Sequence, residues 1–156
     1  MTDRITMTVP DMIPMPRLFD YFELQGEEHT QLAPFYERLA DGDLSTTRCD
    51  DCEKIHFPPR IVCPACMGDS LSYESLPSVG TLHTFTEVRA GAPLGMEDEV
   101  PFVVGIVDLG SVKLSARIED ATDDDLTIGD EVELVILDIE GPGDEERVFY
   151  RFTPVS

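Results

Sequence analysis

Hydrophobic positions in this chain recur first at the spacing of a helix and then alternate as they do in strands. A helical period follows Thr30, which we expect to cap the helix, and it stops at Gly42. The apolar positions on its single face are Leu32, Phe35, Tyr36 and Leu39. This stripe either packs against the body of the chain or serves as a docking surface for another subunit.

The residues before this helix have a weaker pattern. The first sixteen contain four methionines and three prolines without a period, so we expect an extended and partly mobile arm. A short helix over residues 17–23 would place Leu18, Phe19 and Phe22 on one side. We therefore treat residues 1–43 as an N-terminal arm with helices.

From residue 44 onward the pattern is that of short strands separated by turns. Residues 44–76 contain three of them around two cysteine turns, at Leu44–Arg48, Ile55–Phe57 and Leu71–Glu74. Strand, turn, strand, turn, strand is the layout of a zinc ribbon. A module of this size lacks the core to fold alone, and a bound metal would supply the deficit.

The pattern of residues 77–156 predicts five strands. Five strands can protect their edges by closing into a small barrel of the OB-fold type. A loop over 90–99 follows the first strand, and an acidic helix or loop over 119–125 precedes the fourth. In the first strand, alternation would place Leu82 with Thr84, Thr86 and Val88, opposite Phe85. The strands are Gly80–Arg89, Pro101–Asp108, Val112–Ile118, Glu131–Ile139 and Arg147–Thr153.

The four cysteines of the chain form two Cys-x-x-Cys pairs separated by ten residues. Two such turns present four sulfurs to one tetrahedral Zn²⁺, with bonds of about 2.3 Å. A shell of four sulfurs is closed to water and substrate, so the ion would be structural. The predicted ligands are Cys49, Cys52, Cys63 and Cys66.

Other uses of the cysteines are less well supported. Disulfides need an oxidising compartment, and the N-terminal residues carry no apolar run of signal-peptide length. A redox pair would need a βαβ pattern, which does not surround either pair. No stretch approaches the ~20 apolar residues of a membrane span. We expect a cytoplasmic protein without membrane contact.

The charge is strongly negative, at −21 from 32 acidic and 11 basic residues, with only two lysines. The acids are distributed along the whole chain rather than massed in a tail. Such a surface stays hydrated at high salt, where the Debye length near 1 M is about 3 Å. We interpret the composition as that of a salt-adapted protein. It weighs against nucleic-acid binding, which needs clustered basic residues.

Several short motifs in this order carry a resemblance to a known family. They are the stretch from Phe35 to Leu44, Arg48-Cys49, Phe57-Pro58-Pro59-Arg60, Cys63-Pro64-Ala65-Cys66, Gly80-Thr81-Leu82 and Pro101-Phe102. Over residues 18–154 the chain resembles the zinc-ribbon plus OB-fold family of acyl-CoA-associated proteins. The Pro-Pro-Arg between the cysteine pairs is the most specific motif. Glu53 departs from the pattern, because ribbons usually place glycine after the second cysteine.

The resemblance implies a mainly β protein with N-terminal helices, in which a rubredoxin-like zinc ribbon precedes a five-stranded OB-fold barrel. It also implies a non-catalytic accessory or bridging subunit of a thiolase (acetyl-CoA C-acetyltransferase) complex, in some lineages joined by hydroxymethylglutaryl-CoA synthase. The salt-adapted composition agrees with an archaeal setting. Coenzyme A thioesters would be contacted within the complex, and the protein would not be an enzyme by itself.

The residues themselves offer no obvious catalytic centre. Zinc would occupy all four thiols, and none of the three histidines, His29, His56 and His83, has a nucleophile beside it in sequence. We expect His56 and His83 to be exposed or packing residues. The acidic run at 123–125 is most simply a solvated surface rather than a calcium site.

Arginine is the side chain best suited to the phosphates of coenzyme A. Arg60, between the cysteine pairs, and Arg89, before the 90–99 loop, are the candidates, with ordinary surface ion pairs as the alternative. Two rival functions also stay open. One is a nucleic-acid-binding OB-fold protein that uses the barrel's aromatic residues, and the other is a zinc hydrolase in which one thiol leaves the metal.

Overall fold

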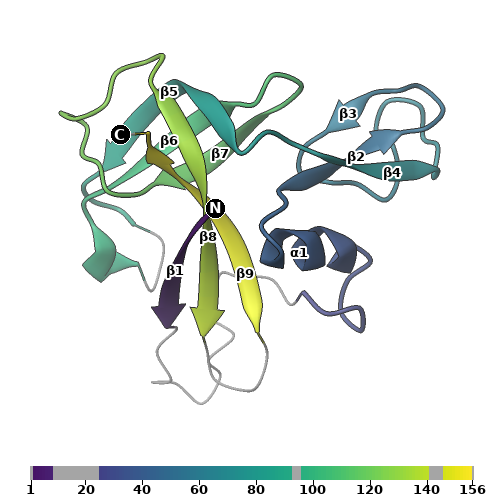
Figure 1. The fold of residues 1–156 in the computed structure, drawn as a ribbon, viewed down its shortest axis with the longest axis horizontal. Coiled ribbons are helices and arrows are strands. Elements are labelled where there is room, and N and C mark those ends of the chain that lie inside the picture. The colour runs from purple at the N-terminus through teal and green to yellow at the C-terminus, as the bar shows by residue number, and fades with distance from the viewer. Residues whose placement is uncertain (1, 9–24, 93–95, 141–145, 156) are drawn as a thin grey trace.

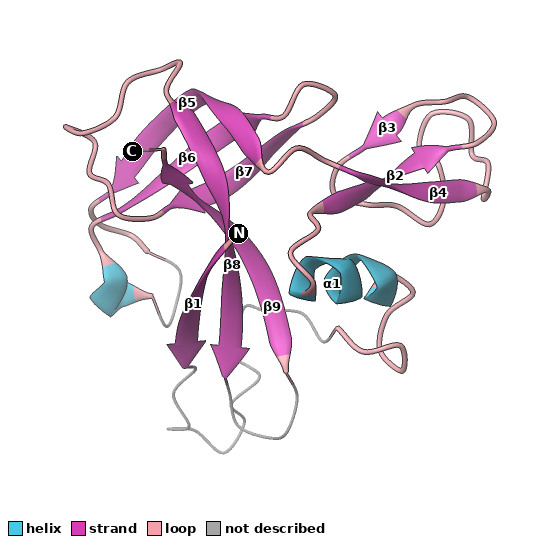
Figure 2. Ribbon diagram, viewed as in Figure 1, coloured by secondary structure: helices cyan, strands magenta, loops and turns pink. Residues whose placement is uncertain are grey.

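The computed structural model describes residues 2–8, 25–92, 96–140 and 146–155, and strands dominate them (Figure 2). The elements are β1 (Asp3–Thr8), α1 (Ala33–Ala40), β2 (Ser45–Cys49), β3 (Ile55–His56), β4 (Leu71–Ser75), β5 (Val79–Val88), the 3-10 turn η2 (Glu97–Glu99), β6 (Phe102–Asp108), β7 (Lys113–Ile118), β8 (Glu131–Glu140) and β9 (Arg147–Pro154). A small sheet of β2, β3 and β4 lies beside a larger sheet (Figure 1).

The larger sheet closes into the predicted barrel. Its strand order is β1-β8-β5-β6-β7-β9, and β8 also pairs with β9, so β5 to β9 form a ring. The closure between β7 and β9 is narrow, a single bridge from Ile118 to Phe152. Fully buried apolar side chains fill the interior, including Leu82, Val107 and Phe152. The expected five-stranded, OB-like barrel is confirmed.

Residues 3–8 of the predicted N-terminal arm are extended as expected, but they form the paired strand β1 and are not a mobile arm, and residues 9–16 lie outside the described part. This strand pairs in parallel with residues 135–140 of β8. It fills the edge of β8 that β5 leaves open, since β5 pairs only with residues 131–133. The guanidinium of Arg4 binds the carboxylate of Asp138 across the pair, with 2.9 Å from Nε to Oδ2. A pairing with residues so distant in sequence leaves no local pattern.

The predicted faces of β5 are also wrong beyond its midpoint. The pairing with β6 shifts between Leu82 and Thr84, so His83 is an extra residue in a β-bulge. The bulge reverses the alternation. Leu82 is buried, Thr84 is exposed, and Phe85 packs against the core instead of lying on the opposite face.

Helix α1 confirms one of the expected N-terminal helices. It ends in a Schellman motif, in which Gly42, at a φ of 87°, and Asp43 donate to the carbonyls of Leu39 and Arg38. Its N-cap is Leu32 rather than Thr30, whose hydroxyl accepts the Leu32 amide at 3.1 Å. The second predicted helix, over residues 17–23, lies outside the described residues. Within the described residues, α1 is the only α-helix. The acidic 119–125 segment forms turns.

The apolar stripe of α1 packs against the body of the chain, so a docking surface on this stripe is excluded. Phe35 is 4% exposed and Leu39 is fully buried. The helix lies between the ribbon and β9 (Figure 1). The ring of Phe57, from the ribbon, sits 6.3 Å from that of Phe35 and 5.6 Å from that of Tyr150 in β9. This aromatic cluster joins the ribbon, the helix and the barrel.

A side chain completes the edge of β9. The amide of Gln25 donates to the carbonyl of Val148 at 2.7 Å and accepts from its N–H at 2.9 Å. Gln25 is only 8% exposed, so the two bonds satisfy polar groups that would otherwise be buried without partners.

Candidate metal centre

Four sulfur atoms converge at the end of the ribbon. The Sγ atoms of Cys49, Cys52, Cys63 and Cys66 all lie within 4.8 Å of one another. Cys49 to Cys66 and Cys52 to Cys63 are each 3.6 Å apart, far beyond a disulfide bond, and all four thiols are free. Tetrahedral Zn²⁺ with bonds of about 2.3 Å holds its sulfurs about 3.8 Å apart. The donor set and its spacing therefore fit one zinc ion.

Both cysteine turns share one backbone pattern, which orients their sulfurs alike. In each, the carbonyl of the first cysteine accepts the amide four residues on, and its own amide donates to the carbonyl five residues on. The distances are 3.0 and 2.9 Å for Cys49 with Glu53 and Lys54, and 2.8 and 2.8 Å for Cys63 with Met67 and Gly68. We call these turns the first and second knuckles.

The residue after the second cysteine of each knuckle is left-handed. Glu53 has a φ of 63° and Met67 a φ of 64°. A side chain in this region costs about 1–2 kcal/mol, which explains why glycine is usual there. The anomaly at Glu53 was visible in the sequence. The equivalent one at Met67 was missed, although it occupies the same place after a Cys-x-x-Cys pair.

Backbone amides polarise the sulfurs before any metal binds. The amide of Cys66, then that of Ala65 and the side chain of His56, lower the pKa of the Cys63 thiol to about 6 against the effect of burial. The amide of Gly68 acts in the same direction on Cys66, but its contacts with the other thiols and burial raise the pKa to about 12. Neighbouring thiolates repel one another, so a divalent cation is needed to ionise all four.

His56 lies closer to the cluster than the sequence indicated. Its Nε2 is 3.3 Å from Cys63 Sγ. In the tautomer that carries its proton on Nε2, His56 donates to this sulfur of the cluster instead of adding a fifth metal-binding atom. A histidine beside a cysteine also suggests a nucleophilic pair. Cys63 is fully buried and faces the other thiols, so a substrate has no path to its sulfur. The signal in the sequence was the position of His56 in the strand between the knuckles.

The two candidate arginines differ in their partners. Arg89 binds Glu87 through Nε and Asp123 through Nη2, both at 2.7 Å. These contacts raise the pKa of Arg89 and lower that of Glu87. Arg60 is exposed, and within the described residues its guanidinium forms no ion pair. The two lie in different modules, so the structure does not unite them in one site.

An apolar hollow in the barrel was not predicted. It has a volume of about 380 Å³ and lies where the loop after β5 meets β6, β7 and β9. Arg117 lines it and is held by Glu99, by Glu119 at 3.4 Å, and over the ring of Phe102 at 4.5 Å. Glu119 also binds Arg151 at 2.6 Å. The apolar lining is Val88, Met96, Phe102, Val104, Phe149 and Tyr150.

The barrel's aromatic residues either pack against the core or line the hollow. Phe152 is fully buried, Tyr150 is 9% exposed, and Phe149 stacks on Tyr150 with ring centroids 4.5 Å apart. Burial raises the pKa of the Tyr150 hydroxyl to about 12. A single-strand platform needs exposed rings beside unpaired cations. These residues do not form one.

The remaining candidates do not gather into a second site. His83 is exposed at the bulge, and the Nε2 of His29 is 3.5 Å from the Glu28 carboxylate. Asp123 pairs with Arg89, and Asp125 accepts from Thr122, rather than converging on a cation. Across the described ranges, the four cysteines are the only cluster suited to a metal. No helix within these ranges is long and apolar enough to cross a membrane.

Comparison with known proteins covers both modules. The profile of the rubredoxin-like zinc ribbon domain of ChsH2 matches residues 37–72, and that of its C-terminal OB-fold domain matches 73–137. A DUF35 domain-containing scaffold protein of Methanocaldococcus jannaschii is 31% identical over 117 residues, 72% of this chain and 82% of the relative. A protein of the same description from Methanothermobacter thermautotrophicus is 30% identical over 112 residues, 70% and 84% of the two chains.

Solved structures agree on the fold. One described as "Ltp2-ChsH2(DUF35) aldolase" has a TM-score of 0.64 at 23% identity, covering 79% of this chain and 93% of that one. A DUF35 protein of Sulfolobus solfataricus has a TM-score of 0.52 at 15% identity, covering 70% and 81%. The regions that match the two family profiles are the ribbon and the barrel seen in the structure. The chain therefore belongs to the DUF35 family of proteins that join a zinc ribbon to an OB-fold domain.

Proposed function

We propose that this protein is a non-catalytic, zinc-binding accessory subunit of a thiolase-type enzyme complex. The match to relatives described as scaffold proteins carries this proposal, because it spans both modules and four-fifths of each relative. The cysteine cluster supports it. A closed shell of four sulfurs stabilises a fold but offers no position for substrate.

Zinc would be held by Cys49, Cys52, Cys63 and Cys66. The ribbon is too small for a core of its own, so metal binding and ribbon folding would be one equilibrium. Metal analysis of the purified protein should give one zinc per chain, and X-ray absorption should show four sulfurs around it. Fewer than four sulfurs would revive a zinc hydrolase, because a position would then be open.

The partner would be a thiolase-like chain, acetyl-CoA C-acetyltransferase, with hydroxymethylglutaryl-CoA synthase as a second enzyme that the subunit bridges. Support comes from the family resemblance and from a related fold described with an aldolase. The acid-rich, lysine-poor composition suits the cytoplasm of a salt-adapted archaeon.

The subunit would also contact the acyl-CoA. Arg60 is exposed without an ion pair among the described residues, so its guanidinium is available for a phosphate. The apolar hollow of the barrel suits an acyl chain or the pantetheine arm, because its two arginines are already neutralised by Glu99 and Glu119. Arg89 is a weaker candidate, since two carboxylates already bind it.

Affinity purification of the tagged chain from its native cells tests the proposal. We expect a thiolase-like chain to co-purify in fixed stoichiometry, and the complex, but not this subunit alone, to turn over acetoacetyl-CoA. Turnover by the isolated subunit would refute a non-catalytic role. Recovery of nucleic acid instead of an enzyme would favour the rival OB-fold function.

A further inference from the structure

The second knuckle presents an apolar surface to solvent. Ile61 is 49% exposed, Val62 39% and Met67 74%, and they account for three of the six large apolar side chains left exposed in the described ranges. No charged residue interrupts the sequence from Ile61 to Gly68. We call Ile61, Val62 and Met67 the apolar knuckle surface.

The first knuckle shows that metal binding does not require this surface. The two knuckles share their backbone hydrogen bonds and their left-handed residue. In the first knuckle the positions equivalent to Val62 and Met67 are Arg48 and Glu53, which pair at 3.1 Å, and Asp50 and Asp51 lie between its cysteines. The same geometry therefore tolerates a charged, hydrated exterior.

Met67 is costly to the isolated protein for two reasons. Its side chain stands on a left-handed backbone, where glycine would be less strained, and it leaves three-quarters of its surface in water. Neither property favours folding. Contact with another molecule would remove the second cost and offset the first, because the exposed thioether and its neighbours would then be buried.

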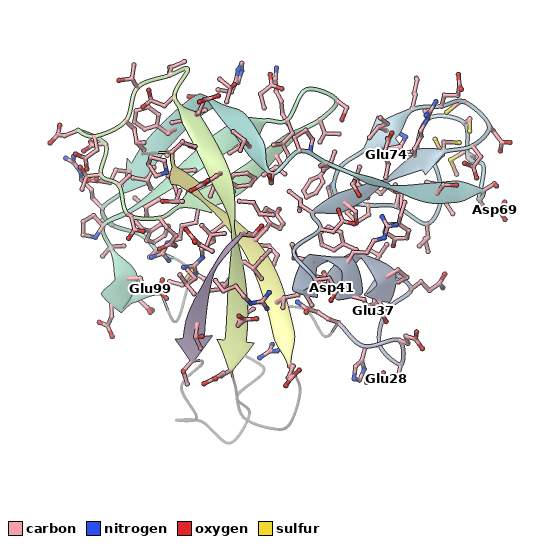
Figure 3. All side chains as sticks on the ribbon, in the orientation of Figure 1. Glu28, Glu37, Asp41, Asp69, Glu74 and Glu99 are labelled. Carbon is pink, nitrogen blue, oxygen red and sulfur yellow. The ribbon has the colours of Figure 1, made fainter. Side chains whose placement is uncertain are left out.

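Acidic side chains border the surface and indicate what covers it. The carboxylate of Asp51 lies against Gly68, where a Cβ would be 2.6 Å from its Oδ2. Asp69, which follows Gly68 in sequence, lies at the end of the ribbon farthest from the barrel (Figure 3). Two copies meeting here would bring like charges together, and each carries a net charge of −21. A complementary partner has an apolar recess edged by basic side chains.

We propose that the apolar knuckle surface is the docking site for the catalytic subunit, seated in an apolar recess bordered by lysine or arginine. This inference rests on the proposed function, since the partner is the thiolase-like enzyme. The zinc ion would then have a second effect, because it fixes the backbone that displays Ile61, Val62 and Met67. The far end of the ribbon, rather than the buried stripe of α1, would carry the apolar contact.

The test transfers the exterior of the first knuckle to the second. The double variant Val62→Arg/Met67→Glu uses residues that the equivalent positions already accommodate, and Glu53→Gln on the first knuckle is the matched control. The thiolase-like chain recovered with the wild-type protein is purified and titrated against each variant. Zinc content and thermal unfolding verify that each ribbon is intact.

We expect the double variant to raise the Kd for the enzyme by about tenfold or more, as for a central apolar contact, and the control to leave it unchanged. Should the double variant lose zinc, Ile61→Ser provides a milder test, with an expected increase of about fivefold. Equal Kd values for the wild-type and an intact variant would overturn the docking site.

Two other results would also overturn it, and they differ in what else they refute. Dimers of the wild-type chain that dissociate in the double variant, seen by sedimentation, would assign the surface to a second copy. A wild-type chain that binds no thiolase-like subunit would refute the proposed function itself. Failure of the inference alone has a distinct signature, since the enzyme then binds the wild-type and the variant equally.

Discussion

Replacement of the two left-handed knuckle residues by glycine should tighten zinc binding. A side chain at φ 63° or 64° costs about 1–2 kcal/mol, and glycine removes this cost at Glu53 or Met67. Glycine also adds about 0.4–1 kcal/mol of freedom to the unfolded ribbon. The net gain is about 0.5–1 kcal/mol for each position.

Because ribbon folding and metal binding are coupled, this gain appears as zinc affinity. One substitution should raise the affinity about two- to fivefold, and both together about 5- to 25-fold. The assay is competition with a chromophoric chelator, which reports the zinc dissociation constant of each variant directly.

Alanine variants separate backbone strain from lost contacts. Glu53→Ala removes the ion pair with Arg48, worth about 0–1 kcal/mol at the surface, but keeps the Cβ that causes the strain. Ala65→Gly is the opposite control, because Ala65 does not have a positive φ and glycine there relieves no strain. This variant should bind zinc slightly more weakly than the wild-type protein. If the glycine and alanine variants at Glu53 and at Met67 bind zinc with equal affinity, backbone strain does not limit the zinc affinity of the ribbon.

Three further predictions concern the ribbon and its ligands. Phe57→Ala should lower the free energy of unfolding by about 2–3 kcal/mol in denaturant titrations, because the ring joins the ribbon to the helix and barrel. The zinc content should stay at one ion per chain, and Phe57→Leu should recover part of the lost stability. His56→Ala should weaken zinc binding about tenfold by removing the side chain that contacts Cys63, and His56→Gln, which keeps an N–H donor, should restore most of the affinity. Equal zinc affinities for the wild-type protein and His56→Ala would show the contact to be incidental. In the assembled complex, Arg60→Ala should weaken coenzyme A binding about tenfold by calorimetry, whereas Arg89→Ala, already neutralised by acids, should not; an unchanged affinity for the first would discard the phosphate contact.

Long-range contacts determined the features that the sequence did not predict. Strand β1 pairs with residues more than 130 positions away, and its own composition gives no sign of that partner. The bulge at His83 depends on the register between β5 and β6, and one extra residue reverses every side chain beyond it. The proximity of His56 to Cys63 depends on how the second knuckle folds back over β3.

Local chemistry accounts for what the sequence alone could determine. Two Cys-x-x-Cys pairs ten residues apart specify a cluster of four thiols, because each turn is closed by bonds within six residues. Alternating apolar positions determined the strands of the ribbon and barrel, and the helical stripe with its Gly42 stop determined α1. Only the tertiary structure decided that this stripe is buried, that the barrel's aromatic residues pack against the core or line the hollow, and that Ile61, Val62 and Met67 remain exposed. Burial depends on which surfaces meet, and a sequence pattern specifies a face without specifying what covers it.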